Sequence, residues 1–232
     1  VGHRYRIGFS KVGSLTFISH LDMQKVVARI FKRSETKVLY SEGYNIRPLI
    51  SLGPALSLGV SSLCEYFDFR TPDKIEDEEA FLAKLHKFSE KGLVFNNIRE
   101  IGVKDLSIQV AVDEFTYFLP ITDQTQNYDD ALKTFTDSEN IFVESFSKKK
   151  KKFIQKDLKP RIKSIELGTI GLDDKMKKII DEVSPCYGTG FIIKTDVTHG
   201  TSVRPMDLKR GAESLGLLVE KPIKVASRLI TT

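Results

Sequence analysis

The first hundred residues carry a regular succession of strand and helix signals, and this succession restricts the possible folds more than any other feature of the chain. Residues 4–10 alternate polar and apolar side chains, which is typical of a half-buried strand. The apolar positions of residues 23–31 recur at helical spacing, which predicts an amphipathic helix of about four turns. Ser19 followed by Asp22 resembles a capping box, so we expect the helix to begin there.

Further along, the signals complete a β-α-β-β-α-β order. Leu49–Leu52 and residues 65–70 predict two more strands. Thr71-Pro72-Asp73 opens a second helix, which stops at Gly92, and Val94–Ile101 predicts a closing strand. This order is the ferredoxin-like split βαβ arrangement.

The second half shows a similar succession with an insertion. Strands are expected at 110–119, 141–146, 191–197 and 223–230, and helices at 128–135 and 205–215. The insertion, at about 147–187, holds a further strand at 162–167. The sequence therefore predicts an α+β protein of two tandem ferredoxin-like domains, at 1–104 and 105–232, the second carrying the insertion.

The charge of the chain is concentrated in one segment. The net charge is +5, but residues 148–163 alone hold nine Lys or Arg and one Asp, a local +8, which leaves −3 for the remainder. This pattern excludes a histone-like polycation and favours a localised anionic partner.

Composition excludes several other classes of protein. The two cysteines, Cys64 and Cys186, are too few for a disulfide framework or a cysteine-rich zinc or iron–sulfur site. The chain has no apolar run long enough to span a bilayer and no signal-peptide core at its start, so a cytoplasmic location is expected and no membrane partner. The first residue is Val1 rather than Met, which suggests a segment of a longer polypeptide.

The lysine run at 148–152 has two interpretations. It is either a solvated hairpin tip between Phe146 and Phe153, or a phosphate-backbone contact with salt-dependent affinity. In the second case Phe146, Phe153 and Arg161 add stacking.

His20 is the main candidate for chemistry, because it stands in the first turn of the predicted helix. An anion can bind at such a helix start, and a neutral imidazole near Tyr40 or Lys11 can act as a general acid or base. The alternative is that Ser19 caps the helix and His20 only packs locally. The remaining histidines share no metal spacing, so we expect neither a metal nor a cofactor.

Two arginines precede prolines, Arg47 before Pro48 and Arg204 before Pro205, and either side chain is a candidate phosphate or carboxylate donor. The alternative for each is an arginine packed on its own loop. The complete set of predicted RNA- or anion-binding residues is Ser19, His20, Lys25, Arg29, Arg47, Lys148, Lys149, Lys150, Lys151, Lys152, Arg161 and Arg204.

Four segments in order carry a family resemblance: SHLD at 19–22, YSEGYNIRPLISLGPALSLGV at 40–60, PRIKSIEL at 160–167 and GTSVRP at 200–205. Together they resemble the bacterial "radical SAM-linked" family of unknown function, whose members lie beside, or are fused to, a cobalamin-binding radical SAM-type protein. The similarity is strong over 4–70 and weak over 160–215. Tyr44 replaces the usual Phe, and Ile46-Arg47 stand where Pro-His is common.

The resemblance implies a companion protein rather than the radical enzyme itself. A radical SAM cluster needs three cysteines at CxxxCxxC spacing, and this chain has two cysteines 122 positions apart. At the level of fold, tandem ferredoxin-like domains with a histidine near the first helix also look like the CRISPR repeat-processing endoribonucleases of the RAMP superfamily, which cleave RNA without a metal. Tyr187–Phe191 weakly resembles their glycine-rich loop, and its other interpretation is a turn before a strand.

Three functions remain open at this point. The first is a non-catalytic, RNA-binding companion of a radical SAM-type enzyme, presenting a tRNA or rRNA for modification. The second is a metal-independent endoribonuclease, with His20, Tyr40 and Lys11 as candidate catalytic residues. The third is a protein–protein adaptor that docks onto the radical SAM-type partner.

Overall fold

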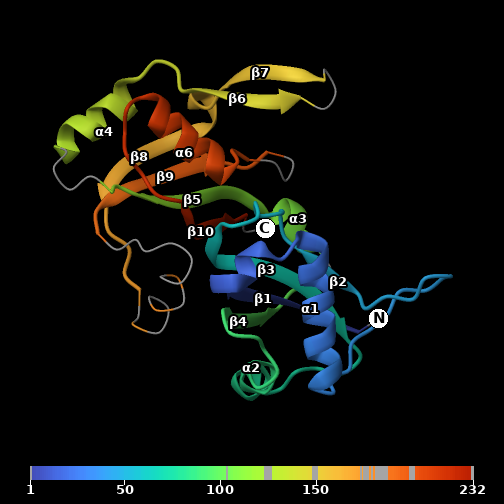
Figure 1. Ribbon diagram of the computed structural model, residues 1–232. Coiled ribbons are helices and arrows are strands. Elements are labelled where there is room, and N and C mark those ends of the chain that lie inside the picture. Colours follow the sequence, from blue (N-terminus) through green and yellow to red (C-terminus); the bar gives the residue numbers. More distant parts are fainter. Residues whose placement is uncertain are drawn as a thin grey trace. The chain divides into compact units, whose positions relative to one another are not determined.

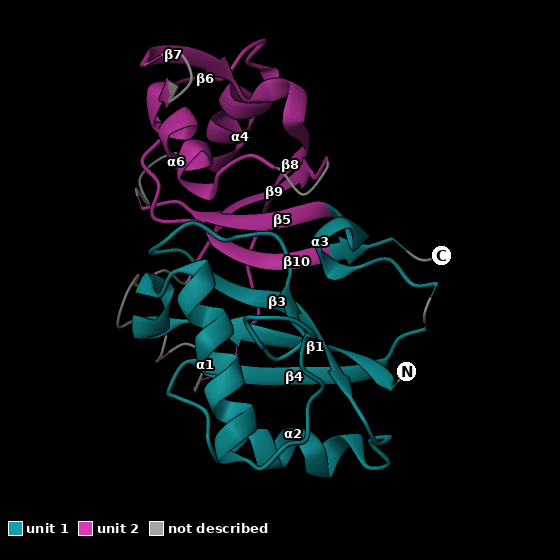
Figure 2. Ribbon diagram, turned by 90° about the vertical axis from the view of Figure 1, so that its right-hand side faces the viewer, with its two compact units in different colours: residues 1–113, 228–232 teal, residues 114–227 magenta. Residues whose placement is uncertain are grey.

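The protein is a mixed α+β structure, seen in a computed structural model (Figure 1). It divides into two compact units, unit 1 with residues 1–113 and 228–232, and unit 2 with residues 114–227 (Figure 2). No helix in the described part of the chain is long and apolar enough to cross a membrane. The residues described are 2–102, 104–122, 127–147, 151–172, 174, 178, 180, 188–198 and 202–230.

Unit 1 has the strand and helix order predicted for the first hundred residues. Its sheet order is β4-β1-β3 with β2 on the far side of β3, and all of these pairs are antiparallel. Tyr40 and Pro48 form only an isolated bridge before β2. The elements are β1 (His3–Lys11), the 3-10 helix η1 (Gly13–Phe17), α1 (His20–Arg33), β2 (Ile50–Leu52), β3 (Ser61–Thr71), α2 (Glu78–His86), β4 (Leu93–Glu100) and α3 (Ile108–Ala111).

The core of unit 1 lies between α1, α2 and one face of this sheet. The apolar stripe predicted for α1 is confirmed, since every apolar residue of that stripe, from Met23 to Phe31, is buried. The Phe31 ring meets Phe67 and Phe69 of β3 at centroid distances of 6.0 and 4.9 Å. Figure 2 shows α1 lying across the strands of the sheet.

Unit 2 differs from the sequence-based expectation in how its strands pair. Its main sheet has the order β10-β5-β9-β8, while β6 and β7 form a separate two-stranded sheet. The elements are β5 (Val112–Pro120, which starts at the end of unit 1), α4 (Tyr128–Asp137), β6 (Phe142–Ser147), β7 (Lys152–Asp157), the 3-10 helix η2 (Lys159–Arg161), β8 (Ile162–Gly168), β9 (Gly190–Asp196), α6 (Pro205–Ser214) and β10 (Ile223–Leu229).

The segment predicted as the second strand of this sheet is therefore β6, which pairs with β7 instead. The strand that occupies the sheet edge is β8, which the sequence had assigned to the insertion. Phe146 and Phe153 are cross-strand partners in the β6–β7 pair. This aromatic pair stabilises the local hairpin, so β6 pairs with β7 rather than with a strand of the main sheet. The departure from the repeated pattern begins at residue 142 rather than at 147.

Candidate functional site

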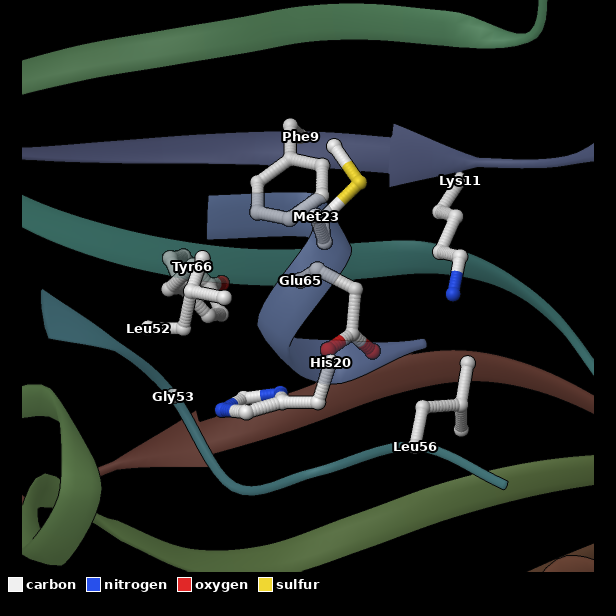
Figure 3. Close-up of a pocket in the computed structure, with 9 residues that line it drawn as sticks. All are labelled: Phe9, Lys11, His20, Met23, Leu52, Gly53, Leu56, Glu65 and Tyr66. Atoms are coloured by element: carbon white, nitrogen blue, oxygen red, sulfur yellow. The ribbon is translucent and has the colours of Figure 1, made fainter. Parts of the chain in front are cut away.

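Three ionisable side chains of unit 1 meet at one end of its core. Lys11 ends β1, Glu65 stands on β3 and His20 is the first residue of α1. Together they line a cavity of about 20 Å³, and we call these three residues the polar cluster. Figure 3 shows their polar ends directed toward the loop that carries Gly53 and Leu56. A cavity of this size holds about one water molecule.

Strand alternation explains why charged residues stand at this place. Phe9 and Glu65 are cross-strand partners, so the Glu65 side chain continues the apolar face that Phe67 and Phe69 form. Lys11 continues the same face on β1. Both are buried, at 5% exposure for Lys11 and 7% for Glu65. Charged side chains are rarely so buried without partners, so this position is a candidate for function.

Each buried charge has a hydrogen bond that holds it in place. The Lys11 ammonium donates to the Ile18 carbonyl oxygen at 2.7 Å. The Ser62 hydroxyl donates to a carboxylate oxygen of Glu65, also at 2.7 Å. These bonds orient the two side chains before any ligand arrives.

The start of α1 places His20 beside them. Ser19 is the N-cap, and its hydroxyl oxygen accepts a hydrogen bond from the Asp22 backbone N–H at 3.2 Å. The same hydroxyl donates to the Asp22 carboxylate at 2.7 Å. The capping role that the sequence predicts for Ser19 is confirmed, and it fixes His20 as the first helical residue.

The surroundings make His20 a proton acceptor at neutral pH. Burial lowers the pKa of the imidazole below its ordinary value of 6.5, Lys11 lowers it further, and Glu65 partly opposes them. Burial also lowers the pKa of the Lys11 ammonium. A neutral imidazole, an ammonium and a carboxylate around one small cavity form a set of groups able to move a proton.

Tyr40, the third catalytic candidate from the sequence, is not part of this cluster. It does not line the cavity, it bridges Pro48, and it is 53% exposed. Among the described residues, no group of three His, Cys, Asp or Glu side chains is arranged to hold a metal ion.

Three of the predicted anion-binding residues line a neighbouring cleft of about 550 Å³, the Phe17 cleft. They are Ser19, Lys25 and Arg29, and the exposed ring of Phe17 accompanies them. Lys25 is partly neutralised by Asp22, 2.9 Å away. Arg47 lies elsewhere, in a third cleft of unit 1, together with Arg4 and Arg70.

The predicted basic residues of unit 2 separate into two groups. Arg161 is engaged within the fold, because its guanidinium lies 2.7 Å from Asp196. Arg204 is exposed at the N-cap position of α6. Lys151 and Lys152 are exposed at the turn of the hairpin, and no ion pair among the described residues engages them. Lys148, Lys149 and Lys150 lie outside the described residues.

The hairpin also presents an aromatic pair. Phe146 and Phe153 are 52% and 68% exposed, and their rings meet edge to face at 5.4 Å. Figure 1 shows β6 and β7 (yellow) extending beyond the main sheet of their own unit. In the described part of the chain these strands pair only with each other. We call β6 and β7 together with Lys151 (residues 142–147 and 151–157) the lysine hairpin.

Glu65 is the member of the polar cluster that the sequence interpretation missed. The signal was available, because Glu65 shares its alternation phase with Phe67 and Phe69 in a strand whose opposite phase is polar. An acidic residue at a position that alternation assigns to the buried face of a strand needs a partner inside the protein.

Comparison with known proteins places the chain in a family. No curated protein matches it at a significant level. Residues 4–203 match a family described as "uncharacterized protein conserved in bacteria" (DUF2344), and the matched stretch includes the polar cluster, the Phe17 cleft and the lysine hairpin. The chain therefore belongs to the DUF2344 family of bacterial proteins.

Proposed function

We propose that the protein is an RNA-binding companion of a radical SAM-type enzyme and that it presents a structured RNA, such as a tRNA or rRNA, for modification. The observation that carries the RNA part is the exposed pair Phe146 and Phe153 beside a run of lysines. The enzyme partner rests on the motif resemblance. An RNA of these kinds also implies a cytoplasmic location.

The lysine hairpin combines the two features that recognise the unpaired, single-stranded segments of a structured RNA. Two large apolar rings exposed on a two-stranded sheet add little to a core, but their faces can stack on bases, at about 1–3 kcal/mol per base. Lysines at the adjacent turn supply sequence-independent attraction to phosphates. The Phe17 cleft of unit 1 offers the same combination with Lys25 and Arg29.

We also infer that the two units are tandem ferredoxin-like domains. When the lysine hairpin and the short helices η1, η2 and α3 are set aside, the described elements of each unit follow the order strand, helix, two strands, helix, strand. Each sheet places its last strand beside its first, in the orders β4-β1-β3-β2 and β10-β5-β9-β8. The common order supports a duplicated domain, since sheet order is characteristic of a fold.

The RNA proposal is tested by removing the rings. We expect Phe146→Ala and Phe153→Ala each to weaken binding of tRNA or rRNA fragments at least fivefold in a fluorescence anisotropy titration. Phe142→Ala is the matched control, because Phe142 is also exposed but stands at the base of the same hairpin. Absence of wild-type binding at low salt, or equal losses in all three variants, would contradict the proposal.

A second candidate, metal-independent RNA cleavage, is favoured by the polar cluster. In this reaction the ribose 2′-oxygen attacks the adjacent phosphorus, the P–O5′ bond breaks and a cyclic phosphate forms. Neutral His20, which is partly exposed, accepts the 2′-hydroxyl proton, and a solvent water supplies a proton to the departing 5′-oxygen, because the Lys11 ammonium is buried and already donates to the Ile18 carbonyl.

Cleavage of end-labelled RNA in EDTA tests this candidate. His20→Gln is expected to lower the rate at least 100-fold. Tyr40→Phe is expected to leave it unchanged, because Tyr40 does not line the cavity. Intact RNA after incubation with the wild-type protein would remove this candidate and leave the binding proposal standing.

The adaptor function is favoured by the loop between Tyr40 and Pro48. Tyr44 is fully exposed and Ile46 is 70% exposed in this loop. A docking role requires that the radical SAM-type partner is retained by the protein after nuclease treatment. The Tyr44→Ser variant should no longer retain that partner. If the wild type and the variant retain it equally, the loop between Tyr40 and Pro48 is not part of the interface.

A further inference from the structure

One face of the unit 1 sheet holds more guanidinium groups than its carboxylate can pair. Arg4 is the cross-strand partner of Arg70, and Arg6 is the partner of Asp68. All four side chains belong to the same strand face, opposite the aromatic core. Like charges directly opposite each other in a sheet are destabilising, so the Arg4–Arg70 pair needs a neighbouring anion, and on this face the nearest carboxylate in the β3 sequence is Asp68.

Asp68 is already fully engaged. Its carboxylate accepts from Arg4 at 2.7 Å and from Arg6 at 2.7 and 3.0 Å. The backbone N–H of Ile108 adds a bond at 3.1 Å. A carboxylate with these partners has little capacity left for Arg70.

A third arginine reaches the same place from the loop before β2. The Ser41 hydroxyl accepts from the Arg47 backbone N–H at 3.0 Å, and the Ser41 N–H donates to the Arg47 carbonyl at 2.8 Å. Arg4, Arg47 and Arg70 line one cleft of about 660 Å³, the arginine cleft, and Pro48 and Ile50 also line it. No ion pair among the described residues engages the side chains of Arg47 or Arg70.

We propose that the arginine cleft binds the phosphate monoester of a nucleotide-sized ligand. Of the three arginines that line the cleft, Arg4 is paired with Asp68, whereas Arg47 and Arg70 have no ion pair among the described residues, which leaves a surplus of two positive charges there. A phosphate monoester carries about −1.5 to −2 at neutral pH and so matches that surplus, whereas a single carboxylate does not. Guanidinium groups bind phosphate oxygens in pairs, and the volume lies within the range of small-molecule sites.

Two sources supply this chemistry, a free nucleotide and the 5′-phosphate end of an RNA. The cleft is lined by residues of unit 1 and shares none with the lysine hairpin, so AMP binding does not depend on the proposed RNA function. Binding of AMP is measured by isothermal titration calorimetry, with adenosine as the ligand that lacks the phosphate. Short RNAs with a 5′-phosphate or a 5′-hydroxyl form the second arm.

We expect AMP to bind and adenosine not to bind. Arg70→Gln and Arg47→Gln should each weaken AMP at least tenfold, and neither disturbs the bonds to Asp68, so both variants should fold. Lys32→Gln is the control, since this exposed residue of α1 does not line the cleft. Thermal unfolding of each variant verifies that it is folded.

The two arms separate the sources. Tighter binding of the 5′-phosphorylated RNA than of AMP identifies an RNA end, and tighter binding of AMP identifies a free nucleotide. The proposal is overturned if neither phosphate ligand binds, if the phosphate makes no difference to affinity, or if Lys32→Gln weakens AMP as much as Arg70→Gln does.

Discussion

At the scale of single residues, the polar cluster shows what a local sequence pattern contains and what it omits. The sequence predicts the cap at Ser19 and places His20 beside it, because both depend on neighbouring residues. The sequence offers Lys11 and Tyr40 as alternative neighbours of His20. It does not decide between them, because the answer depends on how the chain turns back between β1 and α1. Glu65 is contributed by a strand 45 positions beyond His20 in sequence, and only its alternation phase hints at burial.

The electrostatics of this cluster give a prediction with a definite sign. Glu65 opposes the lowering of the His20 pKa and Lys11 adds to it, so Glu65→Gln should lower that pKa and Lys11→Met should raise it. An NMR titration of the His20 ring measures both shifts, with Glu90→Gln as a remote carboxylate control. Equal pKa values in the wild type and both cluster variants would show that the three groups do not interact.

The same lowered pKa affects stability. The unfolded chain, with a His pKa near 6.5, binds the proton more readily than the folded one. The contribution of His20 to stability is therefore present at neutral pH and is lost as the pH falls through 6.5 toward the folded pKa. His20→Gln should flatten this part of the stability curve in urea unfolding between pH 7 and pH 5.

At the scale of elements, strand existence is predictable here and strand pairing is not. Alternation identifies residues 141–146 as a strand, but period two says nothing about which strand lies alongside. The partner of β6 is β7, which follows it after a short turn. Pairing with a strand of the main sheet would require closing a longer loop, at a higher cost in chain entropy. In the structure α6 packs on β6, and Gly211 permits the close approach.

Gly211→Ala tests this packing. A Cβ at that position would lie 2.6 Å from Cγ2 of Ile141 and 3.2 Å from Cδ1 of Leu158. The clash should outweigh the roughly 1 kcal/mol that alanine gains over glycine in a helix, for a net loss of about 1–2 kcal/mol. Gly171→Ala, whose Cβ would have no atom of the described residues within 4 Å, should change the unfolding free energy by less than about 1 kcal/mol. Equal values for the two variants would contradict the packing argument.

At the scale of the whole molecule, the basic residues of the chain divide into those that are paired within the fold and those that are exposed, which composition alone does not reveal. The segment 148–163 carries a local +8, but its C-terminal part is used within unit 2. Arg161 pairs with Asp196, Lys163 lies 3.1 Å from Glu114, and Lys159 donates to the Thr136 carbonyl. Among the described residues of this segment, Lys151 and Lys152 at the turn of the lysine hairpin remain exposed and without an ion pair. The sequence locates the basic segment, and only the fold separates its structural part from its exposed part.

This division predicts how RNA affinity responds to salt. Each lysine that contacts a phosphate of single-stranded RNA adds about 0.7 to the slope of log affinity against log salt. A Lys151→Gln/Lys152→Gln double variant should therefore lower the magnitude of the slope by about 1.4, measured by anisotropy from 50 to 300 mM KCl. Lys37→Gln/Lys74→Gln, which removes two exposed lysines of unit 1 that pair with Asp73 and Glu76, should leave the slope unchanged because those charges are compensated locally. If the two double variants reduce the slope equally, the attraction arises from the net charge of the molecule, and the lysine hairpin has no special part in it.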